Sequence, residues 1–390
     1  MTKSLVFLSN SLTPHQIPFC EEMYRILGNS FNFIQTAPMS EERKQMGWRI
    51  EGVHPYLLTW QQNPSLCQKI VYDAGCVMAG SAPEHLLQSR IRASKLLLRY
   101  SERPLKKGLE PLKYLPRLLK WHYQNPPHKP IYMLCASAYT AGDYAKFGLF
   151  KNRTFKWGYF PATKTYDINN LLAKKSTAKQ VNILWAGRFL DCKHPELALK
   201  TAYKLRHAGY KFSLKFIGGG PLENRLKEQT QELHLTDFVC VLGMMPPEQV
   251  RAHMEQADIF LFTSDFNEGW GAVCNEAMNS GCAVVASHAI GSVPFLMKHT
   301  KNGLIYKNGN FQELYKQVVY LIEHSQERKS MGKEAYYTIA GYWNAEIAAK
   351  RLLELMENIR QGKDMVFNEG PCSPAQPIFQ KDMYEYLTSN

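Results

Sequence analysis

Short apolar runs alternate with longer amphipathic segments along most of the chain, which predicts alternating strands and helices. Residues 103–130 hold six prolines and many Lys and Arg, so we expect little regular structure there. In the first half of the chain we expect strands at residues 5–9, 31–36, 76–79, 95–100 and 131–136, and helices at residues 16–27 and 137–147.

The second half shows the same alternation more clearly. Gly209 and Gly281 stand where glycines that end helices belong. Strand–helix–strand units in series predict a parallel sheet covered by helices on both faces. We expect strands at residues 181–186, 212–217, 238–242, 259–263 and 282–286, and helices at residues 195–208, 222–233, 247–257, 272–280, 310–324 and 344–360.

A length of 390 residues is sufficient for two domains. We predict an N-terminal Rossmann-like domain over residues 1–165 and a C-terminal Rossmann-like domain over residues 180–342. The polar stretch 163–179 is interpreted as the linker between them. Residues 343–390 then form a C-terminal helix and tail, and a return of this segment to the N-terminal domain is left open.

Composition narrows the class of protein only in part. The chain has no apolar run of the roughly 20 residues that a membrane helix needs, and its start lacks the pattern of a secretory signal. Its nine cysteines form neither a CxxC pair nor a zinc-type cluster, so we expect free thiols in a reducing cytoplasm, buried at Cys76, Cys240 and Cys282. The net charge of +13 indicates acidic partners without choosing among them.

The most informative segment follows the strand expected at residues 259–263. A polar loop there carries Glu268 and Gly271, and the next helix carries Glu276. A loop after a parallel strand opens at the carboxyl edge of the sheet, where ligands bind, and glycine lets the backbone approach closely. Carboxylates accept hydrogen bonds and therefore suit sugar hydroxyls. The alternative is a tight turn with two solvated acids.

Two further motifs precede this loop. Arg188 directly follows an expected strand, and Lys193 lies five residues further on, so both side chains can reach a pyrophosphate. Two solvated surface cations are the alternative. Gly218, Gly219 and Gly220 form a turn between a strand and a helix, which alone is a weak signal. This turn has neither the GxGxxG pattern of dinucleotide-binding proteins nor the Lys-Ser/Thr ending of a phosphate-binding loop.

Taken together, residues 181–306 resemble the donor half of family-four retaining glycosyltransferases of the bacterial cell-surface glycan type. That family has a Gly-Arg with a Lys five residues on, a G-x-G-P turn, and two Glu separated by seven residues. The resemblance implies the GT-B fold, an α/β architecture of two Rossmann-like domains that face each other across a cleft. It also implies a hexosyltransferase that keeps the configuration of the transferred sugar.

The resemblance assigns roles by position. Arg188 and Lys193 would hold the donor diphosphate, Glu268 the donor sugar and Glu276 the ribose. It implies no cofactor and no catalytic metal, and the chain has no Asp-x-Asp pair to hold a metal ion. Further donor contacts would come from Gly187, Gly219, Gly220, Met244, Met245, Trp270, Gly271, Ala272 and Val273.

The N-terminal half fits the family less well, and its acceptor-side candidates are Asn10, His15, His85 and Glu102. The loop after the first strand, which begins at Asn10, has no glycine. Many family members have a His near the reacting sugar, and the matching place here offers Glu102. Glu102 would orient the acceptor or the donor sugar, and a surface salt bridge with Arg103 is the alternative.

The expected activity is sugar transfer from a nucleotide diphosphate sugar to a hydroxyl of a glycan or a lipid-linked glycan. A UDP-sugar is favoured on family frequency alone. One alternative is a basic nucleic-acid-binding protein, but no recognisable module interleaves the basic residues with aromatics, so we expect no nucleic acid. A second alternative is a dinucleotide-dependent oxidoreductase, but the absence of the GxGxxG pattern argues against this class.

Residues 90–120 carry ten Lys and Arg and only two Glu, with leucines recurring at near-helical spacing. This pattern is typical of a basic amphipathic element on an anionic membrane surface. We therefore expect a cytoplasmic protein that is peripheral on the inner face of the membrane. The alternative is a solvated basic loop whose leucines pack on the N-terminal domain.

Overall fold

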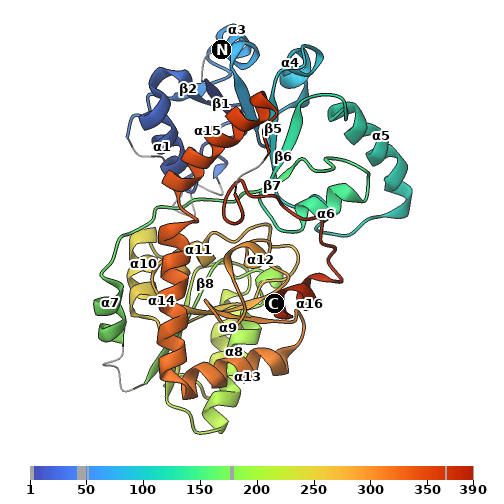
Figure 1. Cartoon of the computed structure of the whole chain (residues 1–390). Coiled ribbons are helices and arrows are strands. Elements are labelled where there is room, and N and C mark those ends of the chain that lie inside the picture. The colour runs from blue at the N-terminus through green and yellow to red at the C-terminus, as the bar shows by residue number, and fades with distance from the viewer. Residues whose placement is uncertain (1–3, 42–49, 51, 176–179, 365–366, 390) are drawn as a thin grey trace. The chain divides into compact units, whose positions relative to one another are not determined.

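The structure is a computed structural model that describes residues 4–41, 50, 52–175, 180–364 and 367–389. The chain forms two compact units (Figure 1). The N-terminal unit comprises Met1–Ala162 with Asn344–Phe379, and the C-terminal unit comprises Thr163–Trp343 with Gln380–Asn390. The polypeptide therefore passes between the units three times.

The N-terminal unit is built on a seven-stranded sheet in the order β3-β2-β1-β4-β5-β6-β7, with every pairing parallel. The central strand β1 is buried along its whole length, and the ring of Phe7 contacts those of Phe19 and Phe33. The strands are β1 (Leu5–Ser9), β2 (Phe31–Gln35), β3 (Leu57–Thr59), β4 (Cys76–Ala79), β5 (Leu97–Ser101), β6 (Ile131–Cys135) and β7 (Thr154–Lys156).

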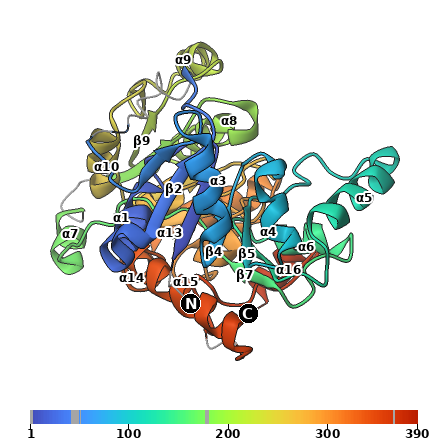
Figure 2. The same ribbon diagram turned by 90° about the horizontal axis from the view of Figure 1, so that it is seen from above.

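Helices lie on both faces of this sheet, and α15 packs against α1 (Figure 1 and Figure 2). The start of α3 follows from its sequence, because Asn63 caps it by accepting a hydrogen bond from the amide of Leu66 and Pro64 occupies its first position. The helices are α1 (Ile17–Leu27), α3 (Pro64–Asp73), α4 (Gln88–Arg92), α5 (Tyr114–Gln124), α6 (Thr140–Ala145) and α15 (Ala345–Gln361), with 3-10 turns η1 (Gly28–Ser30), η2 (Glu84–Leu87) and η3 (Pro111–Lys113).

The C-terminal unit contains a six-stranded parallel sheet in the order β10-β9-β8-β11-β12-β13. Its strands are β8 (Val181–Ala186), β9 (Phe212–Ile217), β10 (Val239–Val241), β11 (Ile259–Phe262), β12 (Ala283–Ser287) and β13 (Leu304–Tyr306). Its helices are α7 (Ile168–Lys175), α8 (Pro195–His207), α9 (Glu223–Glu232), α10 (Pro247–Gln256), α11 (Val273–Asn279), α12 (Val293–Leu296), α13 (Phe311–Glu323), α14 (Ser325–Gly341) and α16 (Met383–Thr388), with the 3-10 turn η4 (Asp191–Lys193).

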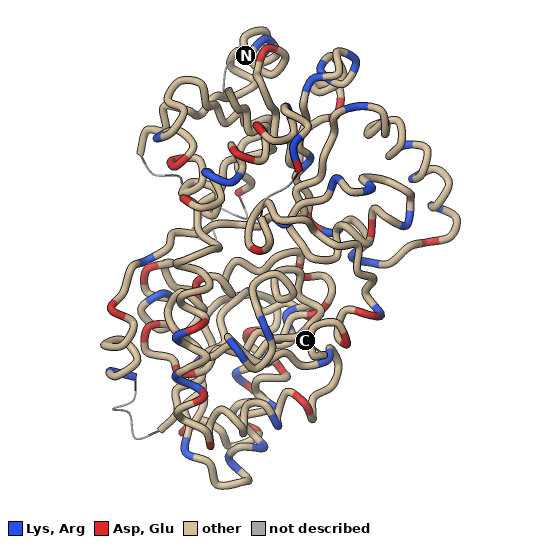
Figure 3. Tube along the Cα trace, in the orientation of Figure 1, with Lys and Arg blue, Asp and Glu red and all other residues tan. Residues whose placement is uncertain are grey.

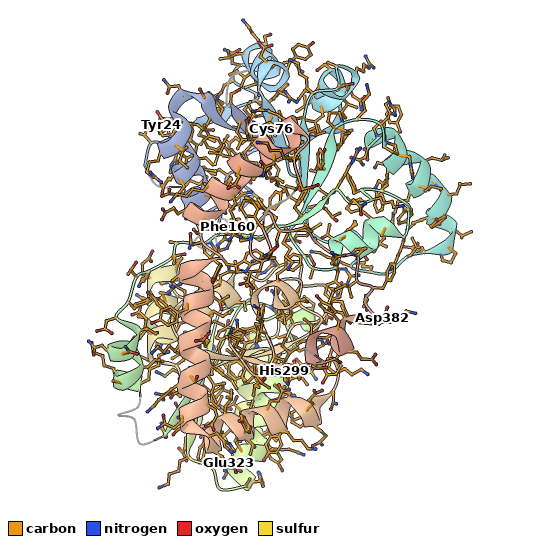
Figure 4. All side chains as sticks on the ribbon, in the orientation of Figure 1. Tyr24, Cys76, Phe160, His299, Glu323 and Asp382 are labelled. Atoms are coloured by element: carbon orange, nitrogen blue, oxygen red, sulfur yellow. The ribbon has the colours of Figure 1, made fainter. Side chains whose placement is uncertain are left out.

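Apolar side chains fill the space between sheet and helices in each unit (Figure 4). In the C-terminal unit the rings of Trp185 and Phe189 stack with centroids 5.4 Å apart, and both contact Phe216. Burial of these aromatic residues contributes to the stability of the unit. This core lies directly beneath the loops that follow β8 and β9.

In each sheet, the order in which successive strands are added changes direction at one pair of neighbouring strands. The reversal falls between β1 and β4 in the N-terminal unit and between β8 and β11 in the C-terminal unit. In open parallel sheets, ligands bind beside the carboxyl ends of the two strands at such a switch point. In the C-terminal unit, the Arg188 and Lys193 motif follows β8 and the Glu268 loop follows β11.

The predicted fold class is confirmed, since both units are α/β structures on parallel sheets. One expectation about local structure was wrong, because helix α5 forms inside the proline-rich segment 103–130. Helix α7 forms inside the stretch interpreted as a linker. In α5, Pro116 lies in the first turn, where its missing N–H breaks no helical hydrogen bond. All nine cysteines are free, but Cys240 is exposed, contrary to expectation.

The last residues of the chain contact both units. Cys372 and Ala375 donate backbone hydrogen bonds to Lys156 and Thr154, so this stretch lies antiparallel to the edge strand β7. Helix α16 then belongs to the C-terminal unit, where the hydroxyl of Tyr384 donates to Glu313. The ring of Tyr384 also lies 5.4 Å from that of His288.

Candidate active site

At the switch point of the C-terminal sheet, the structure brings together two residues that are far apart in the sequence. The amino group of Lys193, in the turn after β8, donates to the carboxylate of Glu268, in the loop after β11. Ser264 donates to the same carboxylate oxygen at 3.2 Å. Only 17% of the Lys193 side chain and 11% of the Glu268 side chain are exposed, so this ion pair is largely shielded from water.

Thr263 fixes the turn and the loop to each other. Its hydroxyl accepts a hydrogen bond from the indole N–H of Trp185 at 2.9 Å and donates to the carbonyl oxygen of Lys193 at 2.7 Å. The amide of Asp265 donates to the carbonyl oxygen of Cys192 at 3.0 Å. Because these bonds link adjacent strand ends through a buried core residue, the positions of Lys193 and Glu268 are set by the sheet itself.

His194 adds an ionic contact between the same segments. Its backbone is left-handed, with φ of 51°, and its Nδ1 lies 2.8 Å from Glu196. Its Nε2 lies 3.5 Å from a carboxylate oxygen of Asp265. The hydrogen bond to Glu196 raises the pKa of His194, and the charge of Asp265 adds to that rise.

The glycine turn after β9 packs backbone against backbone. A Cβ atom at Gly218, where φ is +141°, would lie 1.8 Å from the carbonyl oxygen of Gly187. At Gly220, with φ of +148°, it would lie 2.7 Å from the carbonyl oxygen of Phe189. Only glycine therefore fits at these two positions, and their fit keeps the loops after β8 and β9 in close contact.

The remaining donor candidates of this edge lie beside the same turn. Arg188 is exposed and directly follows β8. Met244 is 64% exposed, and a Cβ atom at Gly219 would lie 2.7 Å from its Cγ atom. Met245 is half-buried. A flexible, exposed methionine next to a glycine turn is suited to an apolar or aromatic face of a ligand.

In the loop before α11, the four candidate residues have different environments. The side chain of Trp270 points into the protein, where it is 1% exposed and donates from its indole nitrogen to Asn275 at 2.9 Å. Gly271 has φ of +82°, and a Cβ atom there would lie 2.2 Å from the ring of Phe262. Ala272 and Val273 are half-buried and begin the helix. The loop therefore offers mainly backbone groups to a ligand.

Glu276 lies on α11, eight residues after Glu268 in the sequence. Its side chain is half-buried, and burial raises the pKa of its carboxyl group, while the positive charge of Arg251 opposes that rise. Arg251 donates to the side chain of Asn279, which also accepts from the amide of Lys164 at 2.8 Å. Arg251 was not among the candidates from the sequence, because its helix α10 carries no motif.

In the N-terminal unit, Tyr159 connects two of the acceptor-side candidates. Its hydroxyl donates to Glu102 at 3.0 Å, and its ring lies 6.4 Å from the imidazole of His15. Lys106 pairs with the other carboxylate oxygen of Glu102 at 2.5 Å. The neighbouring Arg103 is buried and pairs with Asp143 at 3.2 Å.

The other two acceptor-side candidates lie elsewhere on this unit. Asn10 follows β1, and its side chain accepts from the hydroxyl of Ser9 at 3.2 Å. His85 is exposed in a surface hollow between α3 and α4, which Lys69 and Arg92 also line. Asn10, His15 and Glu102 thus follow strand ends of the N-terminal sheet, whereas His85 lines a hollow formed by helices.

Residues 169–338 match the family model described as glycosyl transferases group 1. This segment is similar to the group 1 glycosyltransferases. It contains every donor-side candidate, from Gly187 to Glu276. The resemblance found in the sequence is therefore confirmed for the C-terminal unit.

Two of the curated relatives are named for the biosynthesis of bacterial polysaccharides. The amylovoran biosynthesis glycosyltransferase AmsK of Erwinia amylovora is 28% identical over 195 residues, which cover 49% of this chain and 48% of that protein. The putative colanic acid biosynthesis glycosyltransferase WcaL of Escherichia coli K12 is 25% identical over 189 residues, covering 47% of this chain and 46% of that protein. The chain thus spans about half the length of the curated relatives it matches.

Solved structures match the fold over almost the whole chain. Anabaena Alr3699/HepE, crystallised in complex with UDP, superimposes with a TM-score of 0.67 at 17% identity and covers 91% of this chain and 100% of its own. A glycosyltransferase from Rickettsia africae gives a TM-score of 0.66 at 14% identity, and the match covers 92% of this chain and 99% of that chain. These likenesses support the GT-B fold for both units of this chain.

Proposed function

We propose that the protein transfers a sugar from a nucleotide diphosphate sugar to a hydroxyl of a glycan or lipid-linked glycan, with retention of configuration. The observation that carries this proposal is the Lys193–Glu268 pair at the switch point of the C-terminal sheet. A cation and a carboxylate next to glycine-rich backbone match a ligand that combines a diphosphate with sugar hydroxyls.

In the proposed reaction, the acceptor oxygen forms a bond to the anomeric carbon while the bond from that carbon to the diphosphate oxygen breaks. The acceptor proton passes to the departing diphosphate. Arg188 and Lys193 counter the negative charge that develops on this leaving group, which is the role that electrostatic catalysis requires. Glu268 binds hydroxyls of the donor sugar, so it exchanges its contact with Lys193 for contacts with the donor.

Glu276 is proposed to accept hydrogen bonds from the ribose. The raised pKa of its carboxyl group shows that burial opposes its charge, and the hydroxyls of a ribose would replace the lost hydration. Met244 and Met245 would contact the base, and Gly187, Gly219, Gly220 and the backbone of residues 270–273 would surround the phosphates and the sugar. The reaction is proposed to need neither a metal ion nor a cofactor.

The donor and acceptor classes rest on similarity. The Anabaena protein has also been solved in complex with UDP-glucose, which favours a UDP-sugar here. Curated relatives are named for the biosynthesis of amylovoran and colanic acid, which favours a polysaccharide or lipid-linked glycan acceptor. On the acceptor side, Glu102 with Tyr159 and His15 is the best-connected candidate group. The family match disfavours a nucleic-acid-binding protein or an oxidoreductase.

A thermal-shift screen of UDP, GDP, ADP and their sugars tests the proposal. A ligand of the native state at 100 times its dissociation constant adds about 2.7 kcal/mol to the free energy of unfolding. We expect UDP and a UDP-sugar to raise the melting temperature, and turnover to release UDP when a glycan acceptor is present. Failure of every nucleotide to stabilise the protein would refute the donor site.

A peripheral position on an anionic membrane belongs to the same proposal, because a lipid-linked acceptor presents its hydroxyl at that surface. No helix among the described residues is both long enough and apolar enough to cross a bilayer. Attachment would therefore depend on a surface element of the protein.

A further inference from the structure

Aromatic contacts attach one face of helix α5 to the N-terminal unit. The ring of Tyr114 stacks on Phe147 with centroids 5.0 Å apart, and Trp121 contacts both Phe147 and Tyr144. The imidazole of His122 lies 2.8 Å from the carbonyl oxygen of Phe147. These contacts fix α5 to α6 and the turn after it, and α5 lies at the outer edge of the unit in both views (Figure 1 and Figure 2).

The opposite side of α5 carries apolar side chains that point into solvent. Leu112 is 93% exposed, Leu115 60%, Leu119 65% and Tyr123 69%. Spacings of three and four residues place these four side chains on one stripe of the helix and of the 3-10 turn before it. The expectation that these leucines pack on the N-terminal domain is therefore wrong for Leu112, Leu115 and Leu119. Exposed contiguous apolar residues of this kind mark an interaction surface.

Basic residues flank this stripe. Lys113 and Lys120 are exposed, and Arg117 lies over the ring of Trp121, 5.6 Å from its centroid. At 100° per residue, Lys113, Arg117 and Lys120 fall between the leucine stripe and the face that carries Trp121 and Tyr114. Glu110, paired with Lys113 at 2.7 Å, is the one acidic residue between residues 106 and 124. Figure 3, in the orientation of Figure 1, shows blue Lys and Arg positions along α5.

Other cations of the segment 90–120 differ from those on α5, because they are buried or paired with acidic residues. Arg90 is fully buried and donates to backbone carbonyl oxygens, among them that of Ala74 at 2.7 Å. Arg103 is buried against Asp143, and Arg99 pairs with Glu84 at 2.7 Å. The expectation that the whole basic segment faces a membrane is wrong for Arg90 and Arg103, because burial makes them part of the unit's internal structure.

We propose that α5 and the turn η3 form the docking surface of this protein for an anionic lipid bilayer. The leucine stripe inserts between headgroups, while Lys113, Arg117 and Lys120 contact lipid phosphates. Exposed apolar residues flanked by cations have both of the properties that an interfacial helix needs. The attraction of the cations decays over about 8 Å at physiological salt, so only residues held at the surface contribute. This inference rests on the membrane position in the proposed function and names the element that docks, and it does not depend on sugar transfer.

Co-sedimentation with vesicles tests this surface. We expect the full-length protein to pellet with vesicles of phosphatidylcholine mixed with phosphatidylglycerol, and not with phosphatidylcholine alone. Changing Leu112, Leu115 and Leu119 together to Ser should weaken the vesicle affinity at least tenfold. Changing Lys113, Arg117 and Lys120 together to Gln should do the same and remove its salt dependence. These side chains are exposed except for that of Arg117, which is half-buried, and the melting temperature of each variant checks that it folds.

A matched control removes the same charge elsewhere. Lys211, Arg225 and Lys316 are exposed residues of the C-terminal unit, and their joint change to Gln should leave vesicle binding within twofold of wild type. Equal weakening in this control would overturn the proposal by showing that net charge alone acts. Loss of self-association in the leucine variant, without loss of lipid binding, would assign α5 to a second copy of the chain instead.

The two proposals fail separately. UDP binding by thermal shift should be the same in wild type and in both α5 variants, since none of the changed residues belongs to the candidate active site. A wild type that binds UDP but ignores anionic vesicles at low salt would overturn the docking surface and leave the donor site intact.

Discussion

The amino group of Lys193 contacts the carboxylate of Glu268 across the switch point of the C-terminal sheet. The two residues come from different strand ends, and Thr263 ties those ends together through the carbonyl oxygen of Lys193. Lys193 thus has a fixed position before any ligand arrives. Such preorganisation is what makes a cation effective in stabilising charge that develops on a leaving group.

Replacing either cation should therefore slow the reaction without unfolding the protein. We expect Arg188→Ala and Lys193→Ala each to lower kcat by roughly a hundredfold, because each removes a charge that faces the leaving diphosphate. Turnover is measured as UDP release in the presence of acceptor. Arg225→Ala, an exposed cation on α9, serves as the control and should keep wild-type kcat. Wild-type turnover in the Lys193 variant would place the diphosphate elsewhere.

The two carboxylates should differ in which ligand they recognise. Glu268→Gln is expected to weaken UDP-sugar binding and turnover while the affinity for UDP stays close to wild type, because UDP lacks the sugar. Glu276→Gln should weaken both ligands to a similar degree, because the ribose is common to them. Isothermal titration calorimetry with UDP and with a non-transferable UDP-sugar analogue distinguishes the two roles. The same affinity pattern in both variants would contradict this division of roles.

Metal independence is a third expectation. The chain has no Asp-x-Asp pair, and Arg188 and Lys193 supply positive charge to the proposed diphosphate site. Turnover should therefore stay within twofold of wild type in excess EDTA. A large loss that Mn²⁺ or Mg²⁺ restores would require a metal ion at the diphosphate instead.

The sequence was most informative where a pattern depends on local geometry. Strands β8 and β9 begin and end at the predicted residues, because the apolar residues of a buried strand face mark its extent in the sequence. The donor motifs were found because they follow such strands directly. The contact between Lys193 and Glu268 was not predicted, since it depends on which strands are neighbours in the sheet.

Other features of the structure depend on contacts between residues that are far apart in the sequence, and these could not be predicted from local patterns. Helix α5 was missed because its prolines argued against it, and its contacts with Phe147 were not visible in the pattern. Tyr159 lies in a run that the sequence did not link to any chemistry, and only its hydrogen bond to Glu102 connects it with the acceptor-side candidates. Ser264 could have been inferred from its place directly after β11, where polar side chains approach a ligand.

The glycine turn offers a test of the backbone packing behind the donor site. Gly218→Ala should destabilise the protein by about 3 kcal/mol or more, because its Cβ atom would lie 1.8 Å from the carbonyl oxygen of Gly187. Gly209→Ala is the matched control, with φ of +79° and nothing within 4 Å of the added atom, and should cost roughly 1 kcal/mol. Chemical denaturation measures both, and equal costs would show that the backbone contact is not tight.

The last prediction concerns acid stability and His288. Burial lowers the pKa of this imidazole to about 4, and its Nδ1 accepts a hydrogen bond from the amide of Asn308 at 3.0 Å, which only the neutral ring can do. The nearby charge of Lys307 lowers the pKa further, while the backbone bond with Tyr306 and the charge of Glu313 oppose this. The ring packs against Phe266 in the Glu268 loop and against Tyr384 in α16.

Because the pKa of His288 is lower in the folded than in the unfolded protein, the unfolded state binds more protons between about pH 4 and pH 6.5. The contribution of His288 to stability is therefore fully present above pH 6.5 and is lost as the pH falls towards 4, by up to about 3 kcal/mol. In His288→Asn, where an amide oxygen can replace the Nδ1 acceptor, the free energy of unfolding should fall less steeply across this window. His128→Asn, an exposed position in the N-terminal unit, is the control and should keep the wild-type slope. Equal slopes for wild type and His288→Asn would mean that His288 is not the group whose protonation destabilises the protein in acid.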